Sequence, residues 1–517
     1  MSSLPSSCDV VVIGAGHNGL IAANYLARAG LRAVLLEARS DVGGCSASER
    51  FGGATVNICN CDHITFRTTD VHDELDLASH GLQYLDVEPS QLNLSWDGGS
   101  AWSVWKSVDD TVEELRRTHP HEADNYRRYA RAAIPIARLV LDAAAAGPWR
   151  GSLIRTVVAR GGRGVGRLLR WSSMSAADVM RSFFTDERVF APALATGPVV
   201  WGISPELPGS GLGALTYAFR HVAQVGRPVG GSGALAAALA SSLAANGGTL
   251  HTSTRVDSIL VERGRAIGVR TSTGDVVRAR AVVSAADPRR TLLEWLQNAP
   301  SSAGPTLDRW RSQPHQAGYE SKIDAIIDRV PTYRALTSDT PSAERSLVPS
   351  AMVVPSVAEM HQAWLAIGSG RVADRPVMFA NVPTVLDPTM SPDDRHVFSL
   401  EVLFTPYHHP GGWASSTEPR RWLETYASLV QPGFLDGLGD WRAMTPDRYE
   451  SEFHMPEGHA TSFAGGPIAA LRGKPRELTR YRTPVPGLFL CGAATFPGAG
   501  IWGASGRHCA TTVLRHL

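Results

Sequence analysis

Residues 9–37 read DVVVIGAGHNGLIAANYLARAGLRAVLLE, a run in which strand, glycine turn, helix and second strand follow one another. The apolar, β-branched residues 9–13 predict a buried parallel strand. An apolar helical pattern follows the turn, and a second strand over 33–36 ends in Glu37. This order of elements predicts an α/β unit with a parallel sheet.

The turn between strand and helix is a G-x-G-x-x-G sequence, and each glycine has a mechanical role. Gly14 permits the tight turn, Gly16 lets the backbone approach a pyrophosphate, and Gly19 lets the helix pack against the strand. The helix N-terminus offers N–H groups and a positive dipole end to phosphates. Glu37 lies at about the 20-residue spacing at which a carboxylate accepts hydrogen bonds from an adenosine ribose. We therefore expect an adenine dinucleotide to bind; an ordinary glycine-rich turn is the alternative.

The residues that follow Glu37 distinguish between dinucleotides. ARSDVGGC, residues 38–45, places a second glycine pair soon after the acidic residue. A nicotinamide enzyme has no general need for such a pair, whereas FAD would run back past a loop that must lack side chains. The E-x-R-x-x-x-G-G run resembles the FAD-binding start of the flavoprotein superfamily that includes amine oxidases, phytoene desaturases and Rab GDP-dissociation inhibitors. This resemblance favours FAD, with an NAD-only protein as the alternative.

The C-terminal region supports FAD independently. LFLCGAATFPGAGIWGASGR, residues 488–507, predicts a strand, a small-residue turn and the start of a terminal helix over 504–517. This pattern resembles the closing motif of phytoene desaturase-like flavoproteins. The resemblance implies a second helix N-terminus near 500–503, which would stabilise the negative charge of reduced flavin. Trp502 would cap the flavin or the substrate cavity; an ordinary glycine- and proline-rich loop is the alternative.

A middle segment, residues 226–286, has glycines before an expected helix and strands at 249–253 and 280–286. In the flavoprotein superfamily such a segment lies against the adenine side of FAD. By that resemblance Val256 contacts the adenine through its backbone and Ala285 covers the dinucleotide. Together, the three regions give these expected cofactor-binding residues: Gly14, Gly16, Asn18, Gly19, Glu37, Ala38, Arg39, Gly43, Gly44, Cys45, Val256, Ala285, Gly492, Ala493, Gly500, Ile501 and Trp502.

The expected fold class is α/β, with a discontinuous Rossmann-like FAD-binding domain and an inserted α+β substrate domain. The FAD-binding domain is expected from residues 1–95, 225–300 and 465–517, and the substrate domain from 96–224 and 301–464. The first insert is expected to contain four helices, at 109–117, 122–145, 176–184 and 212–222. The second insert is expected to contain strands at 321–327 and 397–404 that form a sheet over the flavin.

The bulk properties exclude several functions. The 517 residues are 43% hydrophobic and 19% charged, as in a globular protein, and a net charge of +1 predicts no nucleic-acid partner. No window approaches the roughly 18 consecutive apolar residues of a spanning helix. The first residues lack a secretory signal, and six cysteines without framework spacing suit a reducing cytoplasm. We expect a cytoplasmic protein, and the oligomeric state stays open.

The segment NICNCDH, residues 57–63, lies where the flavoprotein superfamily passes close to the flavin ring. The favoured interpretation is that small polar side chains line the cavity there. A C-x-C-x-H metal site would lack a fourth ligand at a useful spacing, so no metal is expected. Redox-active thiols, and a covalent link from His63 or a cysteine to the flavin, stay open as hypotheses. The family usually has an aspartate near Asn57 and a glycine near Cys59, so this loop departs from the pattern.

Three histidines are candidates for catalysis, because the pKa of histidine lies near neutrality. His459 is the first candidate by its position before the closing motif, His454 is the second, and His63 is the third. Each would take a proton while hydride leaves for flavin N5. Glu320 and Lys322 are interpreted as residues on alternating faces of a strand, without a chemical role.

Residues 150–171 carry six arginines and no acidic residue, with apolar side chains between them. One interpretation is an amphipathic segment that dips into an anionic membrane and collects a lipid-like substrate. Glycines at 161, 162 and 164 interrupt the helix, and a solvated basic face is the commoner explanation. Peripheral membrane contact therefore stays open.

The resemblance implies an FAD-dependent oxidoreductase that takes hydride from a small or lipid-like organic substrate, as a desaturase or oxidase of secondary metabolism. No second strand–turn–helix–acid pattern is present for NAD(P)H, so electrons are expected to leave to oxygen or a quinone. Phytoene desaturase-like proteins also cyclise or isomerise polyenes, which is the alternative activity. A non-enzymatic binder of lipidated partners, like the GDP-dissociation inhibitors, is the third interpretation.

Overall fold

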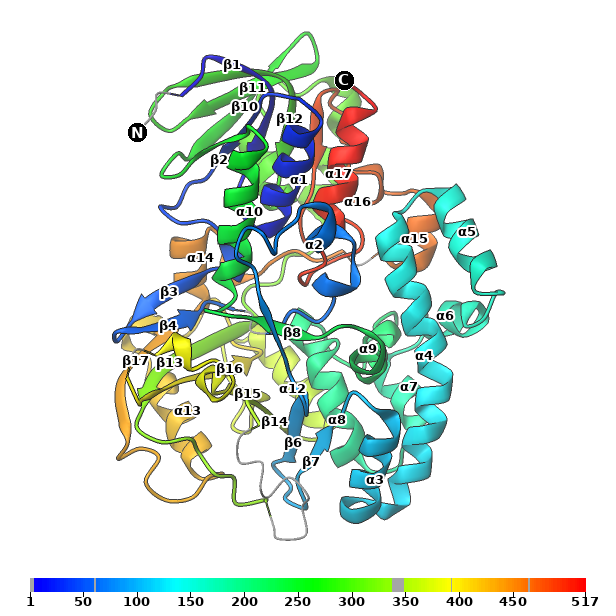
Figure 1. The fold of residues 1–517 in the computed structure, drawn as a ribbon, viewed down its shortest axis with the longest axis vertical. Coiled ribbons are helices and arrows are strands. Elements are labelled where there is room, and N and C mark those ends of the chain that lie inside the picture. Colours follow the sequence, from blue (N-terminus) through cyan, green and yellow to red (C-terminus); the bar gives the residue numbers. More distant parts are fainter. Residues whose placement is uncertain (1–3, 60–61, 337–347, 392, 464) are drawn as a thin grey trace.

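The computed structural model describes residues 4–59, 62–336, 348–391, 393–463 and 465–517. It confirms a mixed α/β fold built around two seven-stranded sheets. The first sheet lies at the top of Figure 1 and the second at the lower left, with a group of helices at the lower right.

The first sheet collects strands from three distant parts of the sequence. Its order is β10-β11-β12-β1-β2-β9, and β18 pairs with β12. β1 runs parallel to both β2 and β12, as expected for an apolar strand buried on both faces. The strands are β1 (Ser7–Ile13), β2 (Ala33–Leu36), β9 (Thr249–His251), β10 (Val256–Glu262), β11 (Arg265–Thr271), β12 (Val276–Ser284) and β18 (Leu488–Leu490).

Three helices cover one face of this sheet. They are α1 (His17–Arg28), α10 (Gly233–Ala245) and α17 (Ala504–Leu514). α1 contacts both of the others, and Figure 1 shows the three helices together, although they come from the start, middle and end of the chain. Their apolar faces share one buried core with the strands. The regions that the sequence linked to one cofactor therefore meet in one layer.

The second sheet has the order β17-β13-β16-β15-β14-β6-β7 and contains both strands expected in the second insert. Its strands are β6 (Gln91–Ser95), β7 (Trp102–Val104), β13 (Glu320–Ile327), β14 (Ser350–Val354), β15 (Met378–Asn381), β16 (His396–Leu403) and β17 (Leu438–Met444). β6 pairs with β14, although the expected boundary at 95 placed β6 in the FAD-binding domain. The strand with which β6 pairs is decided by the long-range topology of the chain, and no local sequence pattern reveals it.

The first insert is helical, as expected, and packs around its own apolar core. Its helices are α3 (Val108–Thr118), α4 (Ala123–Ala146), α5 (Arg150–Ala159), α6 (Val165–Trp171), α7 (Ala176–Arg181), α8 (Glu187–Thr196) and α9 (Thr216–Val222). The helix expected from residue 212 begins only at Thr216. The preceding turn is a 3₁₀ helix in which Gly211 and Gly213 lie tightly against Trp171 and Pro198.

Shorter elements connect these layers. β3 pairs with β4, and β5 pairs with β8. The elements are β3 (Ser48–Phe51), β4 (Ala54–Asn57), α2 (Val71–Glu74), β5 (Tyr84–Asp86), β8 (Gly226–Pro228), α11 (Gly304–Ser312), α12 (Val357–Ile367), α13 (Glu418–Ala427), α14 (Pro446–Phe453), α15 (Gly466–Arg472) and α16 (Arg476–Thr479). Across the described ranges, no helix combines the length and apolar character needed to cross a bilayer.

Candidate functional site

Two glycines of the turn after β1 are required by the protein's own packing. Gly14 has a φ of +93°, in the left-handed region where a side chain is strained. A Cβ on Gly19 would lie 2.0 Å from the Gly14 carbonyl oxygen, which is far inside van der Waals contact. Neither position tolerates another residue without a change in the turn.

Gly16 differs from both neighbours. Its φ of −66° and ψ of 165° are extended values that any residue adopts. Among the described residues, a Cβ on Gly16 would meet only the Gly43 carbonyl oxygen, at 4.0 Å. The fold therefore does not need glycine here. The bare backbone of Gly16 instead leaves room for a ligand to approach the N-terminus of α1.

Glu37, which directly follows β2, contacts the same turn. Its Oε2 accepts a hydrogen bond from Ala15 N at 2.6 Å, and its Oε1 accepts one from Arg39 N at 2.9 Å. Thr254 N donates to the Glu37 carbonyl oxygen at 2.7 Å, which brings the start of β10 at Val256 to the same edge. The carboxylate thus lies beside the glycine turn, in the position predicted for a ribose partner.

Arg39 follows the half-buried Ala38 in this loop. Its guanidinium lies 3.9 Å from the centroid of the Phe453 ring, and its NH2 group pairs with Glu49 at 2.6 Å. Its NH1 nitrogen is buried and has no hydrogen-bond partner within the described part of the chain. A buried donor of this kind is available to a ligand.

The closing motif packs directly onto the start of α1. A Cβ on Gly506 would lie 2.4 Å from the Asn18 carbonyl oxygen, and Gly506 N donates to Asn18 Oδ1 at 3.3 Å. Gly492 N donates to Ser505 Oγ at 2.8 Å, which fixes the loop between β18 and α17. The N-termini of α1 and α17 therefore lie side by side, and neither helix has an acidic residue in its first turn. Such an arrangement fits an anionic ligand.

Ala285 and the residues around Ala493 also belong to the region around the N-termini of α1 and α17. The Ala285 methyl group lies 3.1 Å from the position of a Cβ on Gly19, so it covers the glycine turn. Ala493 follows Gly492 in the loop after β18. Further along that loop, the Ile501 carbonyl oxygen accepts a hydrogen bond from Thr65 Oγ1 at 2.9 Å.

Aromatic side chains surround the tip of the closing motif. Trp502 Nε1 donates to the Ala499 carbonyl oxygen at 2.9 Å, and its ring meets the edge of Phe219 at a centroid distance of 6.4 Å. Trp201 from the helical insert lies over Gly500, where a Cβ would be 3.6 Å from the indole. The tip of the motif is therefore walled by apolar rings.

These observations together fit FAD. The Gly16 backbone and the two adjacent helix N-termini would hold the pyrophosphate, and Glu37 would hold the adenosine ribose. By the family resemblance, Gly43, Gly44 and Gly500 would lie along the remainder of such a long ligand. The glycine turn, Ala285 and the closing motif thus meet in one region of the fold, and their role in binding the cofactor stays a prediction.

His63 does not have a free ring nitrogen. Its Nδ1 hydrogen-bonds with Tyr84 Oη and its Nε2 with Ser232 Oγ, each at 2.7 Å. The ring is fully buried, and burial lowers its pKa to about 3, so it stays neutral. This geometry argues for a structural link between β5 and α10, and against catalysis or a covalent flavin bond through His63.

His454 is half-buried and lies near three arginines. It ends α14 with a φ of +57°, and its carbonyl oxygen accepts a hydrogen bond from Arg290 NH1 at 2.9 Å. Burial, together with the charges of Arg255, Arg290 and Arg39, lowers its pKa. The catalytic role of His454 stays a prediction.

His459 lies near the aromatic tip. Its ring meets Tyr319 edge-on at a centroid distance of 5.3 Å and His315 at 6.2 Å, and it hydrogen-bonds to the backbone of Trp201. Its Nδ1 is buried without a hydrogen-bond partner in the described ranges. Burial and the nearby His315 lower its pKa to about 4, so the ring is neutral at pH 7. A ligand could therefore exchange a hydrogen bond with it.

A cluster of buried charged residues on β13 and β16 was not predicted from the sequence. Glu320, Lys322 and Asp324 lie on the same face of β13, because their positions differ by two. The expectation that Glu320 and Lys322 occupy alternating faces is therefore wrong. Lys322 is fully buried and donates to Asp324 and to the Asn57 carbonyl oxygen. Glu401 on β16 lies opposite Lys322. The E-x-K-x-D spacing of these residues places them on one face of a strand, and this pattern could have indicated the cluster.

The thiols of Cys59 and Cys45 lie close enough to shift each other's pKa, which is lowered for Cys45 and raised for Cys59. Cys45 Sγ is also 3.4 Å from Met455 Sδ. Cys61 lies outside the described residues, so the C-x-C-x-H arrangement has no structural test; within the described ranges no three metal-ligating side chains gather. Redox-active thiols stay a hypothesis, with Cys45 as the neighbour of Cys59.

Glu320 predicts a pH-dependent stability. Burial raises its pKa from 4.5 to about 7, so the folded protein holds a proton that the unfolded chain releases between these values. Stability should therefore fall as the pH rises from about 4.5 to 7, by an amount on the order of 3 kcal/mol. Thermal unfolding of the FAD-loaded protein measured across this range should show the decline in wild type and a weaker one in Glu320→Gln. Exposed Glu262→Gln is the control, and equal slopes in all three proteins would contradict the assignment.

Comparison with known proteins agrees with this site. Residues 12–75 match the NAD(P)-binding Rossmann-like domain family, and residues 171–315 match the flavin containing amine oxidoreductase family. Pyridine nucleotide-disulfide oxidoreductase domain-containing protein 2 of Rattus norvegicus is 30% identical, over 98% of this chain and 94% of that protein. Phytoene desaturase (neurosporene-forming) of Cereibacter sphaeroides is 27% identical over 54% of this chain and 51% of its own. A solved structure of putrescine oxidase bound to putrescine shares the fold, with a TM-score of 0.64, 17% identity and coverage of 98% and 99%.

Proposed function

The chain belongs to the phytoene desaturase-like FAD oxidoreductases of the flavin-containing amine oxidoreductase superfamily, and we propose from this that it dehydrogenates an apolar organic substrate. It is a flavin-dependent oxidoreductase. The finer proposal concerns the substrate, which we infer to be a lipid-like molecule, and the electron acceptor, which we infer to be oxygen or a quinone.

The aromatic wall at the tip of the closing motif carries this proposal. Trp201, Phe219 and Trp502 come from different parts of the chain and meet around Gly500. Ligand sites lined by aromatic rings with few polar groups favour apolar ligands. The relative named phytoene desaturase acts, by its name, on phytoene, which is an apolar hydrocarbon. Both observations support a substrate of the same chemical character here.

Bound FAD would supply the hydride acceptor of this reaction. The aromatic rings would exclude water and hold the substrate. His459 offers a neutral ring whose Nδ1 has no hydrogen-bond partner among the residues that the structure describes, but its pKa of about 4 makes it a weak base at pH 7. We therefore propose that His459 positions the substrate by a hydrogen bond. Glu320, whose buried carboxyl has a pKa of about 7, is better matched to proton transfer.

Anaerobic flavin reduction tests this function. The FAD-loaded protein is mixed without oxygen with polyenes, alcohols and amines, and loss of the yellow colour is followed. Bleaching by an apolar substrate supports dehydrogenation, and reoxidation by oxygen or by a quinone identifies the acceptor. Product formed without bleaching would instead indicate isomerisation or cyclisation, and a protein that takes up no FAD would overturn the proposal altogether.

His459→Gln is expected to slow flavin reduction by up to about tenfold, the effect of losing one neutral hydrogen bond. Because the His459 ring is neutral above about pH 5, the ratio between variant and wild type should stay constant from pH 6 to 8. Stopped-flow absorbance measures both rates. Exposed His121→Gln is the control, and a ratio that changes steeply across this pH range would indicate a base rather than a positioning role.

A further inference from the structure

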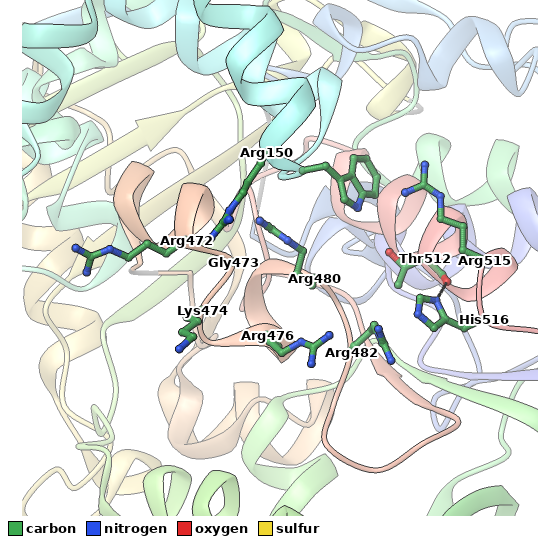
Figure 2. A pocket seen from close by; sticks show the side chains of 11 residues that line it. Arg150, Arg472, Gly473, Lys474, Arg476, Arg480, Arg482, Thr512, Arg515 and His516 are labelled. Carbon is green, nitrogen blue, oxygen red and sulfur yellow. Dashed lines mark hydrogen bonds between the residues drawn. The ribbon is translucent and has the colours of Figure 1, made fainter.

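A basic pocket lies at the end of α17 that is remote from the closing motif. It has a volume of about 450 Å³ and is bounded by the start of α5, the segment 472–482 and the end of α17 (Figure 2). The eleven residues of α17 span about 16 Å. The pocket is therefore separate from the two helix N-termini that fit the dinucleotide.

The lining of this pocket is strongly cationic. Arg150, Arg515 and five lysines and arginines of the segment 472–482 line it, and no carboxylate does. Within the described residues, none of these cations has an ion pair with an acidic side chain. Glu477, the neighbour of Arg476 in the sequence, is buried and pairs with Arg309 instead. The positive charge of the pocket is not neutralised by the protein.

The cations repel one another. Burial and the charges of Arg150 and Arg476 lower the pKa of Arg480, although Tyr481 opposes this shift. Burial and Arg476 likewise lower the pKa of Arg482. Figure 2 shows the guanidinium groups of Arg150 and Arg480 pointing toward each other. A bound anion would relieve this repulsion and accept several charge-assisted hydrogen bonds.

Exposed apolar side chains adjoin the pocket. On α5, Ile154 is 56% and Val158 is 71% exposed; on α15, Ile468 is 46% and Leu471 is 48% exposed. α15 contacts α5, and Arg150 Nε donates to the Leu471 carbonyl oxygen at 3.3 Å. The apolar patch and the basic pocket are therefore continuous.

We propose that this pocket binds a phosphate group, carried by a lipid headgroup or by a soluble phosphate compound. Guanidinium groups match phosphate oxygens with paired hydrogen bonds, and no other charge in the pocket opposes an anion. The adjoining apolar side chains fit the lipid source, because basic residues beside apolar ones are typical of surfaces that bind anionic bilayers. This site is independent of the flavin chemistry.

Two binding experiments on the FAD-loaded protein distinguish the sources. Co-sedimentation uses vesicles of phosphatidylcholine with and without phosphatidylglycerol, and calorimetry uses inorganic phosphate and pyrophosphate. The double variant Lys474→Gln/Arg476→Gln removes two exposed pocket cations. It should weaken binding to phosphatidylglycerol vesicles by about 30-fold, given the usual contribution of a basic residue near an anionic surface. Pyrophosphate binding should weaken as well.

The matched control Arg270→Gln/Arg329→Gln removes the same charge from exposed positions outside the pocket and should bind like wild type. Ile154→Ser/Leu471→Ser should weaken binding to vesicles while leaving binding of pyrophosphate unchanged. Vesicle binding that needs both the pocket and the apolar patch identifies a lipid, and pyrophosphate binding alone identifies a soluble compound. The proposal is overturned if neither probe binds, or if the control loses as much affinity as the pocket variant.

Discussion

Gly16→Ala is expected to yield a folded protein that has largely lost FAD. The backbone at Gly16 is extended, and an added methyl group meets no described protein atom closer than 4.0 Å, so the fold should accept it. The same methyl group would stand in the path of the pyrophosphate. Loss of one hydrogen bond to a charged phosphate costs about 1.5–3 kcal/mol, which weakens FAD binding roughly 10- to 150-fold. Flavin absorbance of the purified protein and FAD titration of the apoprotein measure this loss.

Two further glycine variants serve as controls for this experiment. Gly166→Ala, in α6, also introduces a methyl group into open space and should keep its FAD, because it lies far from the glycine turn. Gly19→Ala should instead unfold or aggregate, because its methyl group would lie 2.0 Å from the Gly14 carbonyl oxygen. Circular dichroism and thermal unfolding distinguish the two kinds of failure. A Gly16→Ala protein that binds FAD like wild type would show that no phosphate approaches this residue.

The helices and strands that form from residues close together in the sequence could be predicted from the sequence. The strand, turn and helix of residues 9–28 follow from an apolar β-branched run, a glycine turn and an apolar helical pattern, and the structure confirms them as β1 and α1. The strands at 321–327 and 397–404 likewise appear as β13 and β16. Their pairing with each other, across the long stretch of sequence between them, could be expected only from the family resemblance, because no local sequence pattern indicates it.

The chemistry of the candidate site was harder to predict, because it depends on contacts between distant segments. His63 is a suitable catalyst by residue type, but Tyr84 and Ser232 occupy both of its ring nitrogens. Cys59 lies beside Cys45, which comes from a different loop. A histidine or cysteine in a sequence gives no information on such partners, whereas a glycine marks positions where the backbone can adopt a left-handed turn or approach another group closely.

Asp324→Asn is expected to destabilise the protein by about 3–5 kcal/mol, the usual effect of removing one partner from a buried ion pair. Asp324 is fully buried and accepts hydrogen bonds from Lys322 Nζ and from Arg442 Nε, the latter at 3.2 Å. Asparagine keeps the shape but leaves the fully buried ammonium group of Lys322 without this negative charge. Urea unfolding of the FAD-loaded protein measures the loss, and exposed Asp436→Asn is the control.

A double-mutant cycle with Lys322→Met tests the pairing that underlies this expectation. Once the ammonium group is gone, Asp324 keeps Arg442 as its ion-pair partner, so the effect of Asp324→Asn should shrink by about 0.5–3 kcal/mol, the range observed for residues in direct contact. Because Lys322 also donates to the Asn57 carbonyl oxygen, both single variants should displace the loop before Cys59 and shift the absorption spectrum of bound flavin. Strictly additive losses with an unchanged spectrum would mean that the pair neither stabilises β13 nor holds the loop beside the cofactor.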